Sequence, residues 1–446
     1  MIKKSTLIFL LCAIILGGVF YYLELKKGLG SKPAETAKSA FSVPEADISS
    51  LTLTHPAKPD QPAIRLDKTK DNWQIVQPMV AAADQPSVQG LLDNLTTAKV
   101  SENTEPATPD RLKVYGLASP QLEIAFQLKN GAKHTLQIGD KDFTGNSIYA
   151  IVDGGKTVSL LPVSVLTGSD KSLDDLRDHA VLHLTTYQVA SFTLKNPSGQ
   201  MDLTKSKDQW KFTKPSDAMA DQDSIDALFT AISNAKLTSF VSEKPEDLGK
   251  YGLANPAIDF TFVDDTGKKS TLLLGKKDGN EYFARNTSRP SIFRVNADLY
   301  TQLAKGYSDL RDKKVLHFDS ADITRVEIHN DHGTIAVNSK GGNQWAIDSP
   351  DAQKGKTAAS YKVFDPLTEL RADQVIDHPE AGLVAKLAKP AIEVTLTDKN
   401  GKKLTLKMSK PAGDVVYAQA SDSSALYKLK KQDFDNLNFE VSNLLE

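Results

Sequence analysis

The chain has 446 residues, of which 40% are hydrophobic and 25% are charged, a composition typical of a globular protein. At roughly 150 residues per domain, this length predicts about three domains. The net charge of −2 favours neither nucleic acid nor an anionic surface as the main partner. The single cysteine, Cys12, lies in an apolar N-terminal stretch, so the rest of the chain has no cysteine for a disulfide, a metal site or a nucleophile.

The N-terminus is predicted to be a membrane anchor. Residues 5–23 are uncharged and mostly apolar. As a helix rising about 1.5 Å per residue they would span roughly 28 Å, close to the ~30 Å hydrocarbon core of a bilayer. A cleavable signal peptide is the alternative, but its apolar region usually has about 7–15 residues and ends in small residues. Here the stretch is longer, and Leu16 stands where the first small residue would be. We therefore expect residues 1–27 to form an uncleaved, single-pass transmembrane helix.

The region after the anchor is predicted to be a flexible tether. Residues 28–44 lack apolar periodicity and are rich in small and polar side chains. The lysines on the two sides of the apolar stretch are almost balanced, so they do not fix the orientation of the anchor. Because a long soluble domain can translocate regardless of such charges, we expect the bulk of the chain on the outer side of the membrane.

The body of the chain is predicted to contain three copies of one unit. Its tryptophans, Trp73, Trp210 and Trp345, lie in similar short phrases and are almost evenly spaced along the chain. A proline follows each tryptophan at nearly the same distance, and an alternating apolar segment and a glycine-containing turn follow that proline. Such self-similarity indicates tandem duplication, in which a terminal copy is expected to diverge. The predicted repeat units are residues 45–179, 180–315 and 316–446, the last being the divergent terminal copy.

Each unit is predicted to be an α+β fold with a mostly antiparallel sheet and two helices. An opening strand, such as residues 48–53, alternates apolar and polar side chains, and two further strands complete a meander. A helix then begins after Asp84 or Asp221, each a natural N-cap, and carries an apolar stripe. Two hairpins and a closing helix that ends in Leu-Arg-Asp follow. Because strands outnumber helices and most connections are short, antiparallel sheets are favoured over a parallel α/β sheet.

The phrase Tyr-Gly-Leu-Ala-x-Pro occurs at residues 115–120 and again at residues 251–256. Gly116 and Gly252 suit a backbone with positive φ, and the proline forces the preceding residue to be extended. We therefore interpret the phrase as a corner that launches the central strand and is anchored by its tyrosine, and not as a binding loop. The third unit replaces this phrase, as expected of a divergent copy.

These features resemble the bacterial proteins grouped as domain of unknown function 4340. The resemblance rests on the N-terminal anchor, the repeated tryptophan strand, the Tyr-Gly-Leu corner, the strands that end in Gly139 and Gly275, and the Leu-Arg-Asp closures. It implies a protein of the bacterial inner membrane whose bulk faces the periplasm, typically encoded beside an ABC-type transport ATPase, its permease and a gliding-motility-type auxiliary protein. By association only, it implies an accessory subunit of a membrane complex.

Candidate metal-ligating histidines have simpler structural interpretations. His179 and His183 have the i,i+4 spacing of a helical metal pair, but the equivalent positions in the next unit are Lys313 and His317. Residues 329–333, with the sequence His-Asn-Asp-His-Gly, are first of all typical of a hairpin turn. A metal site is therefore not expected at either place.

Acidic clusters are interpreted in the same way. Asp221, Asp223 and Asp226 resemble the start of a calcium loop, but they lack its central glycine and its final glutamate. Comparison with Asp84 assigns Asp221 to a helix cap instead. The acidic pairs at residues 174–175 and 264–265 are predicted to be a solvated helix face and a turn.

The sequence shows no other catalytic or nucleic-acid signature. The glycine pairs at residues 154–155 and 341–342 lack the strand–loop–helix context of a phosphate loop, and no Gly-x-Ser-x-Gly elbow occurs. The lysines show no pattern of interleaved aromatic residues, so a nucleic-acid partner is not expected. We therefore predict a protein that is not an enzyme and has no catalytic, cofactor-binding or metal-binding residues.

One polar signature is repeated at the predicted junctions between units. Arg177-Asp178 and Arg311-Asp312 lie one unit apart and follow the closing helices. We interpret them as a salt bridge or helix-end contact that fixes the angle between units. A partner-binding groove at the same junctions is the alternative.

The sequence as a whole favours a non-enzymatic, membrane-anchored extracytoplasmic accessory or scaffold subunit of an ABC-type transport complex, built as an elongated rod. Its expected partners are the membrane and the permease or auxiliary subunits. The alternative is a periplasmic module that binds a lipid or an envelope polymer between sheet and helix, which would need a deep apolar pocket in each unit. An envelope hydrolase, which would need two facing carboxylates in a cleft, is less favoured.

Overall fold

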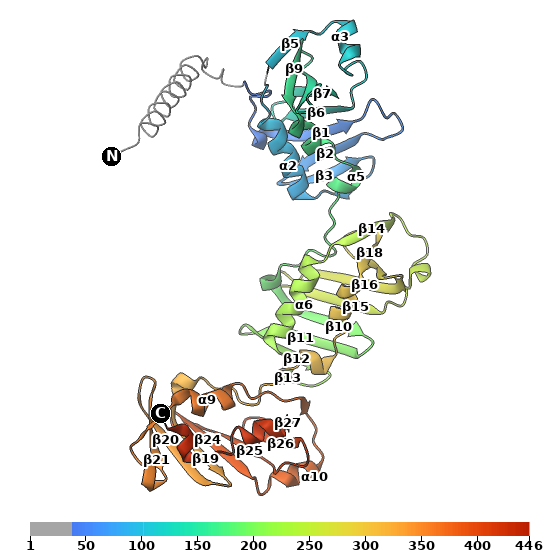
Figure 1. The fold of residues 1–446 in the computed structure, drawn as a ribbon. Coiled ribbons are helices and arrows are strands. Elements are labelled where there is room, and N and C mark those ends of the chain that lie inside the picture. The colour runs from blue at the N-terminus through green and yellow to red at the C-terminus, as the bar shows by residue number, and fades with distance from the viewer. Residues whose placement is uncertain (1–37, 101, 446) are drawn as a thin grey trace, which may run out of the picture. The chain divides into compact units, whose positions relative to one another are not determined.

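The structure is a computed structural model that describes residues 38–100 and 102–445. The predicted anchor, residues 1–27, and the first part of the predicted tether lie outside these described residues. Within the described ranges, no helix combines the length and the apolar character that a membrane span needs. The chain divides into two compact units, residues 1–179 and residues 180–446, which are described separately (Figure 1).

The first unit is built on a nine-stranded antiparallel sheet with the order β4-β3-β2-β1-β6-β7-β8-β9-β5. Two four-stranded meanders meet where β1 pairs with β6, and β5 adds to the far edge beside β9. The strands are β1 (Ile48–Thr54), β2 (Ile64–Thr69), β3 (Asn72–Gln77), β4 (Ala81–Ala82), β5 (Glu102–Pro106), β6 (Leu122–Leu128), β7 (Lys133–Lys141), β8 (Ser147–Val152) and β9 (Thr157–Pro162). The helices are α2 (Gln85–Thr96), α3 (Pro109–Val114), α4 (Val163–Ser169) and α5 (Leu173–Leu176).

The second unit contains two further nine-stranded antiparallel sheets with the same strand order. The strands of its first sheet are β10 (Val189–Asn196), β11 (Gly199–Ser206), β12 (Gln209–Lys214), β13 (Ala218–Met219), β14 (Leu237–Ser242), β15 (Ile258–Asp264), β16 (Lys269–Asp278), β17 (Glu281–Asn286) and β18 (Ile292–Asn296). The helices that accompany it are α6 (Gln222–Asn234), α7 (Ala297–Leu303) and α8 (Tyr307–Leu310).

The other sheet of the second unit is formed by the last part of the chain. Its strands are β19 (Ile323–Asn330), β20 (Gly333–Gly341), β21 (Gln344–Ser349), β22 (Thr357–Ala358), β23 (Gln374–Ile376), β24 (Ile392–Asp398), β25 (Lys403–Met408), β26 (Val415–Ala420) and β27 (Leu426–Lys430). Its helices are α9 (Ser360–Thr368), α10 (Ala381–Val384) and α11 (Lys431–Asp435). The sheets that begin with β1, β10 and β19, with their helices, are called the first, second and third repeats.

The core of each repeat fills the space between the sheet and its long helix. Figure 1 shows α2 and α6 lying across one face of their sheets. In the second repeat, Phe192 of β10 packs edge-on against Trp210 of β12 and Phe229 of α6, with ring centroids 5.2 and 5.3 Å apart. All three side chains are at most 2% exposed. Large apolar groups buried in this way contribute about 1.5–3 kcal/mol each and leave the space between sheet and helix occupied.

The predicted caps of the long helices are confirmed in the first two repeats. The carboxylates of Asp84 and Asp221 accept hydrogen bonds from the backbone N–H groups of Ser87 and Ser224, each at 2.9 Å. In the third repeat Ala359 stands at the N-cap of α9 and makes no side-chain cap. The third repeat therefore lacks the side-chain cap that the other two repeats have at the start of the long helix.

The Tyr-Gly-Leu phrase forms the predicted corner. Gly116 and Gly252 have φ angles of 68° and 70°, in the left-handed region that favours glycine. The carbonyl oxygen of Tyr115 accepts a hydrogen bond of 2.8 Å from the backbone N–H of Asp140 at the end of β7. Leu117 of the corner belongs to a small apolar cluster of its own, which also contains residues of β8 and β9.

The last residues of the expected tether belong to the first repeat. Phe41 is 3% exposed and packs edge-on against Phe126 of β6 at 5.0 Å, and Ser39 pairs with Lys99 in an isolated bridge. An aromatic side chain with a core position available is buried rather than left on a flexible linker. Residues 38–44 therefore differ from the expectation of a tether.

The fold contains repeats, as the sequence indicated, and it is largely β where the sequence predicted an α+β fold. The mostly antiparallel sheets and the accompanying helices are confirmed, but two helices per unit was too low a number. In the described ranges each repeat has one long helix, α2, α6 or α9, and two or three short ones. The short helices include single turns, whose length gives too little apolar periodicity for recognition from sequence.

Candidate functional site

The predicted Arg-Asp signature of the second repeat lies at a cluster of charged side chains inside the second unit. Arg311 follows α8, and its guanidinium contacts the carboxylate of Asp377, which follows β23 of the third repeat. Arg311 Nε is 3.2 Å from Asp377 Oδ1, and Arg311 Nη2 contacts the same oxygen. The Tyr307 hydroxyl donates a 2.8 Å hydrogen bond to Asp377 Oδ2. The carboxylate thus receives donors at both oxygens.

Burial and hydrogen bonding shift the pKa of Asp377 in opposite directions. The side chains of Arg311 and Asp377 are only 11% and 17% exposed. Burial opposes ionisation of Asp377, but hydrogen bonds from Arg311 and Tyr307 outweigh it and lower the pKa of the carboxyl group. Burial, aided by the bond to Asp377, raises the pKa of Tyr307 to about 12. The pair is therefore ionised at neutral pH, with a neutral tyrosine beside it.

Asp312, the second member of the signature, connects to the start of the third repeat. Its Oδ1 accepts a hydrogen bond of 2.8 Å from the backbone N–H of Lys314, and its Oδ2 lies 2.6 Å from His317 Nε2. Burial again opposes ionisation, and the bonds from His317 and Lys314 overcome it, so the pKa of Asp312 is lowered.

Another ion pair joins the capped helix of the second repeat to the third repeat. Arg371 contacts Asp221 Oδ2 through Nη2, while Asp221 Oδ1 caps α6. Because the Arg371 side chain is half exposed, this pair is screened by water and is weaker than the pair of Arg311 with Asp377.

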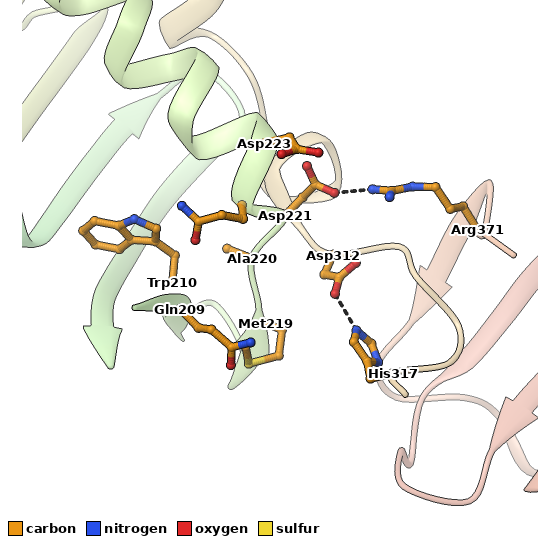
Figure 2. Close-up of a pocket in the computed structure, with 10 residues that line it drawn as sticks. Gln209, Trp210, Met219, Ala220, Asp221, Asp223, Asp312, His317 and Arg371 are labelled. Carbon is orange, nitrogen blue, oxygen red and sulfur yellow. Dashed lines mark hydrogen bonds and ion pairs between the residues drawn. The ribbon is translucent and has the colours of Figure 1, made fainter. Parts of the chain in front are cut away.

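A hollow of about 200 Å³, with both polar and apolar lining, lies beside Asp221, Asp312, His317 and Arg371, as Figure 2 shows. The two dashed contacts of the figure, Asp221 to Arg371 and Asp312 to His317, form one side of it. The hollow is lined by Gln209, Trp210, Met219, Ala220, Asp221, Gln222, Asp223, Asp312, His317 and Arg371. Four of its polar side chains are already paired, Asp221 with Arg371 and Asp312 with His317, so the geometry favours a salt-bridge junction between the second and third repeats over a partner-binding groove.

The first repeat places its copy of the signature in the same backbone setting. Arg177 and Asp178 are both buried, with 8% and 6% of their surface exposed. The backbone N–H of Asp178 donates to the carbonyl of Ala82 at 3.0 Å, as that of Asp312 does to Met219 at 3.0 Å. The signature therefore has a shared local role, in which it closes the end of a repeat against its β4- or β13-type edge strand.

The other candidate residues are dispersed. The segment containing His179 and His183 is not helical, so its i,i+4 spacing does not place the two rings on one face. Residues 329–333 span the predicted hairpin turn, with β19 ending at Asn330 and β20 beginning at Gly333, and the His329 ring lies 2.9 and 2.8 Å from Glu327 and Thr334. In the part of the chain that the structure describes, no group of three His, Cys, Asp or Glu side chains could hold a metal ion.

The acidic pairs also have the predicted local roles. Asp264 Oδ1 accepts hydrogen bonds from the backbone N–H groups of Thr266 and Lys268 in the β15–β16 turn, at 3.0 and 2.9 Å. Ser172 is the N-cap of α5, and the Asp175 carboxylate accepts a hydrogen bond from the Ser172 backbone N–H in a capping box. These carboxylates stabilise a turn and a helix end within their own units.

A second hollow, of about 400 Å³, lies in the third repeat at one end of β19 and β24. His329, Asn330, Asp331, Glu393 and Lys410 line it with Pro390 and Ala391. Asn330 is occupied in donating hydrogen bonds to the carbonyls of Leu437 and Phe439, at 3.2 and 2.9 Å. The hollow is thus mainly polar, unlike the apolar pocket that a lipid would need.

A family model described as "Domain of unknown function (DUF4340)" matches residues 73–211 and 210–386, which together exceed half of the chain. The chain belongs to this family. The two matched segments agree with the repeated character of the DUF4340 fold seen here, and the family's description assigns no activity.

Comparisons beyond the DUF4340 family add no functional assignment. No curated protein matches the chain. Among solved structures, the chain is similar to a DnaN sliding clamp (DNA polymerase III subunit beta) from Pseudomonas aeruginosa bound to griselimycin, at 9% identity over 89% of this chain and 94% of that chain. The TM-score is 0.11, and a likeness at that level carries no argument.

Sequence reasoning missed the partners of the signature. Tyr307, Arg371 and Asp377 were not singled out, although all three engage residues that were. The sequence does hold a signal for Asp377. The edge strands β14 and β23 are equivalent, and each is followed by an acidic residue, Glu243 and Asp377 respectively. Recognising it requires an alignment of two short strands that share almost no other residues.

Proposed function

We propose that this DUF4340 protein is a non-enzymatic, membrane-anchored extracytoplasmic accessory or scaffold subunit of an ABC-type transport complex. The observation that carries the proposal is that the polar groups at the junction of the second and third repeats are paired with one another. Arg311 and Asp377 are largely buried against each other, and Asp312 is bonded to Lys314 and His317. These groups join one repeat to the next, and the hollow beside them is bordered by two such pairs, Asp312 with His317 and Asp221 with Arg371. A chain whose charged signature serves assembly of its own repeats is suited to a scaffold.

The transport and membrane parts of the proposal rest on sequence. The apolar stretch at residues 5–23 has the length of a membrane span. The DUF4340 resemblance supplies the association with an ABC-type ATPase and its permease, and it does so by analogy.

The alternative, a module that binds a lipid or envelope polymer between sheet and helix, is weakened by the packing of the repeats. Phe192, Trp210 and Phe229 occupy that space in the second repeat. In the third repeat Trp345 and Phe364 do the same, with ring centroids 5.0 Å apart. An acyl chain would have to displace these aromatic side chains.

Purification of the tagged full chain from its native membranes in mild detergent tests the proposal. Recovery of a transport ATPase and permease in fixed proportion to the chain is the expected result. The control is an unrelated single-pass membrane protein with the same tag, which should recover neither. Recovery of the chain alone would contradict the proposal.

A further inference from the structure

The turn between β7 and β8 of the first repeat presents a fully exposed aromatic side chain. Phe143 is 97% exposed, more than any other large hydrophobic residue that the structure describes. Single exposed apolar residues are common on protein surfaces and need no special explanation. Phe143 differs from them in two respects. Its turn is fixed by hydrogen bonds, and it belongs to an insertion that the other repeats lack.

The turn that carries Phe143 is fixed by hydrogen bonds on both sides of it. Asp142 Oδ2 accepts a bond of 2.7 Å from the Thr144 hydroxyl, and Asp142 Oδ1 accepts one of 3.0 Å from the backbone N–H of Ser147. The backbone N–H of Gly145 donates to the Asp142 carbonyl at 3.0 Å, and Gly145 has the positive φ of 73° that glycine favours. Because the backbone is already ordered, a partner that binds Phe143 loses little conformational entropy in this loop.

Comparison among the repeats shows that Phe143 belongs to an insertion. Ile138 pairs with Ala150, Leu274 with Ala284 and Met408 with Ala418, and these pairs are equivalent in the three sheets. The intervening segments are residues 139–149, 275–283 and 409–417, so the first is longer than the other two by two positions.

The two extra residues of the first repeat can be located. The second repeat turns with the sequence Asp278-Gly279-Asn280, whereas the first has Asp142-Phe143-Thr144-Gly145-Asn146. Phe143 and Thr144 are thus the additional pair. The shorter turn closes the same hairpin in the second repeat, so the fold does not require the insertion, which supplies one exposed ring and the hydroxyl that helps to fix it.

The charges beside Phe143 indicate what kind of surface it would meet. Asp140, Lys141 and Asp142 precede it, so the turn carries a net negative charge. Such a turn is repelled by an anionic bilayer surface but is complementary to basic groups. Aromatic side chains that enter an apolar pocket, surrounded by a polar rim, are typical anchors of protein–protein interfaces.

We propose that Phe143 is an anchor by which the first repeat docks into an apolar pocket, rimmed by basic side chains, on a protein subunit of the transport complex. This inference rests on the proposed function and names the contact through which the association is made. The net negative charge of the turn complements the basic rim of that pocket, and the phenyl ring fills it.

The chain itself provides a matched variant for the test. Deletion of Phe143 and Thr144 gives the first repeat the Asp-Gly-Asn turn of the second, and Phe143→Ala removes the ring alone. Tyr187→Ala, which removes another exposed aromatic ring, is the control. The full chain and each variant are purified in mild detergent, and the co-purified subunits are quantified by mass spectrometry.

Both Phe143 variants are expected to recover at least tenfold less partner than the wild type, while Tyr187→Ala recovers as much and all variants keep the thermal unfolding midpoint of the wild type. If the wild type recovers transport subunits and the deletion variant recovers them equally, the docking inference is overturned and the proposed function stands. If the wild type recovers none, the proposed function fails, and this inference fails with it.

A photocrosslinking amino acid, p-benzoylphenylalanine, at position 143 separates a protein pocket from a bilayer. Irradiation of cells should give an adduct with a membrane transport subunit, identified by its peptides, and the same probe at Asp278 should not. An adduct with phospholipid alone, or no adduct, would overturn the proposal.

Discussion

Gly139 lies against the carbonyl oxygen of Tyr115, so closely that a Cβ atom at residue 139 would overlap that oxygen. The same relationship holds between Gly275 and Tyr251 in the second repeat. It explains why the Tyr-Gly-Leu phrase and the glycine that ends the following hairpin occur together. In the third repeat the phrase is replaced, and Ser409 stands at the equivalent position of the strand.

Substitution of Gly139 is therefore expected to damage the corner. Gly139→Ala forces the Tyr115 backbone away from β7 and should lower the free energy of unfolding by more than about 2 kcal/mol. Gly90→Ala is the control in the same repeat, because residue 90 is helical with open space around it, and it should be neutral or stabilising by up to about 1 kcal/mol. Urea unfolding followed by circular dichroism measures both. Equal midpoints for the two variants would contradict the backbone overlap.

The two oxygens of Asp221 have separable roles, because one caps α6 and the other contacts Arg371. Asp221→Ala removes both and should destabilise by about 1–2 kcal/mol. Asp221→Asn keeps an oxygen for the cap and loses only the charge, which should lower the free energy of unfolding by less than about 1 kcal/mol because the Arg371 side chain is half exposed. The difference in free energy of unfolding between the wild type and Asp221→Asn should vanish in 1 M salt. The difference between the wild type and Asp221→Ala should largely remain. A salt-independent loss in both variants would argue against this division.

Asn196 joins the end of β10 to the end of α7 and the segment that follows it. Its amide donates to the carbonyls of Leu303 and Lys305, each at 2.8 Å. Removing both donors with Asn196→Ala should lower stability by about 2 kcal/mol. Asn196→Asp keeps the size but turns an oxygen toward the two carbonyls, so it should be at least as damaging in urea unfolding at pH 7. An Asp variant as stable as the wild type would show that the two bonds do not hold this segment.

Features encoded locally were predictable from the sequence, and features that depend on distant segments were not. The caps at Asp84 and Asp221 follow from residue types within one turn of helix, and the corner glycines follow from the backbone they need. The pairing of β5 with β9 and the contact of Arg311 with Asp377 join segments that are far apart in the sequence. The contact of Arg311 with Asp377 depends on the residue that follows the short strand β23, a position that is recognised only once the edge strands of the repeats are aligned. The packing of Phe41 likewise depends on a core that a linear pattern does not show.

Tyr307 should titrate outside the range of an ordinary tyrosine, since its pKa is raised to about 12. Because the folded-state pKa lies above the unfolded value of about 10, folding holds a proton that the unfolded chain releases, and stability falls as pH rises from about 10 to 12. Spectrophotometric titration of tyrosinate in the wild type and in Tyr307→Phe should differ by one group that ionises near pH 12. If the group that Tyr307→Phe lacks instead ionises near pH 10, the result would contradict the hydrogen bond to Asp377.

Asp377 gives the repeat junction a dependence on acid pH. Its folded-state pKa lies below the unfolded value of about 3.9, so the stability it contributes is fully present above that value and is lost as pH falls through the folded pKa. Asp377→Asn leaves the Arg311 charge buried without its counter-ion and should cost about 2–4 kcal/mol at pH 7. The difference between wild type and variant in urea unfolding should persist from pH 7 to pH 5 and shrink between pH 4 and pH 2. Asp435→Asn, at an exposed pair with Lys431, is the control and should change stability by less than about 1 kcal/mol throughout. A difference for Asp377→Asn that is constant down to pH 2 would mean that the carboxylate charge does not stabilise the junction.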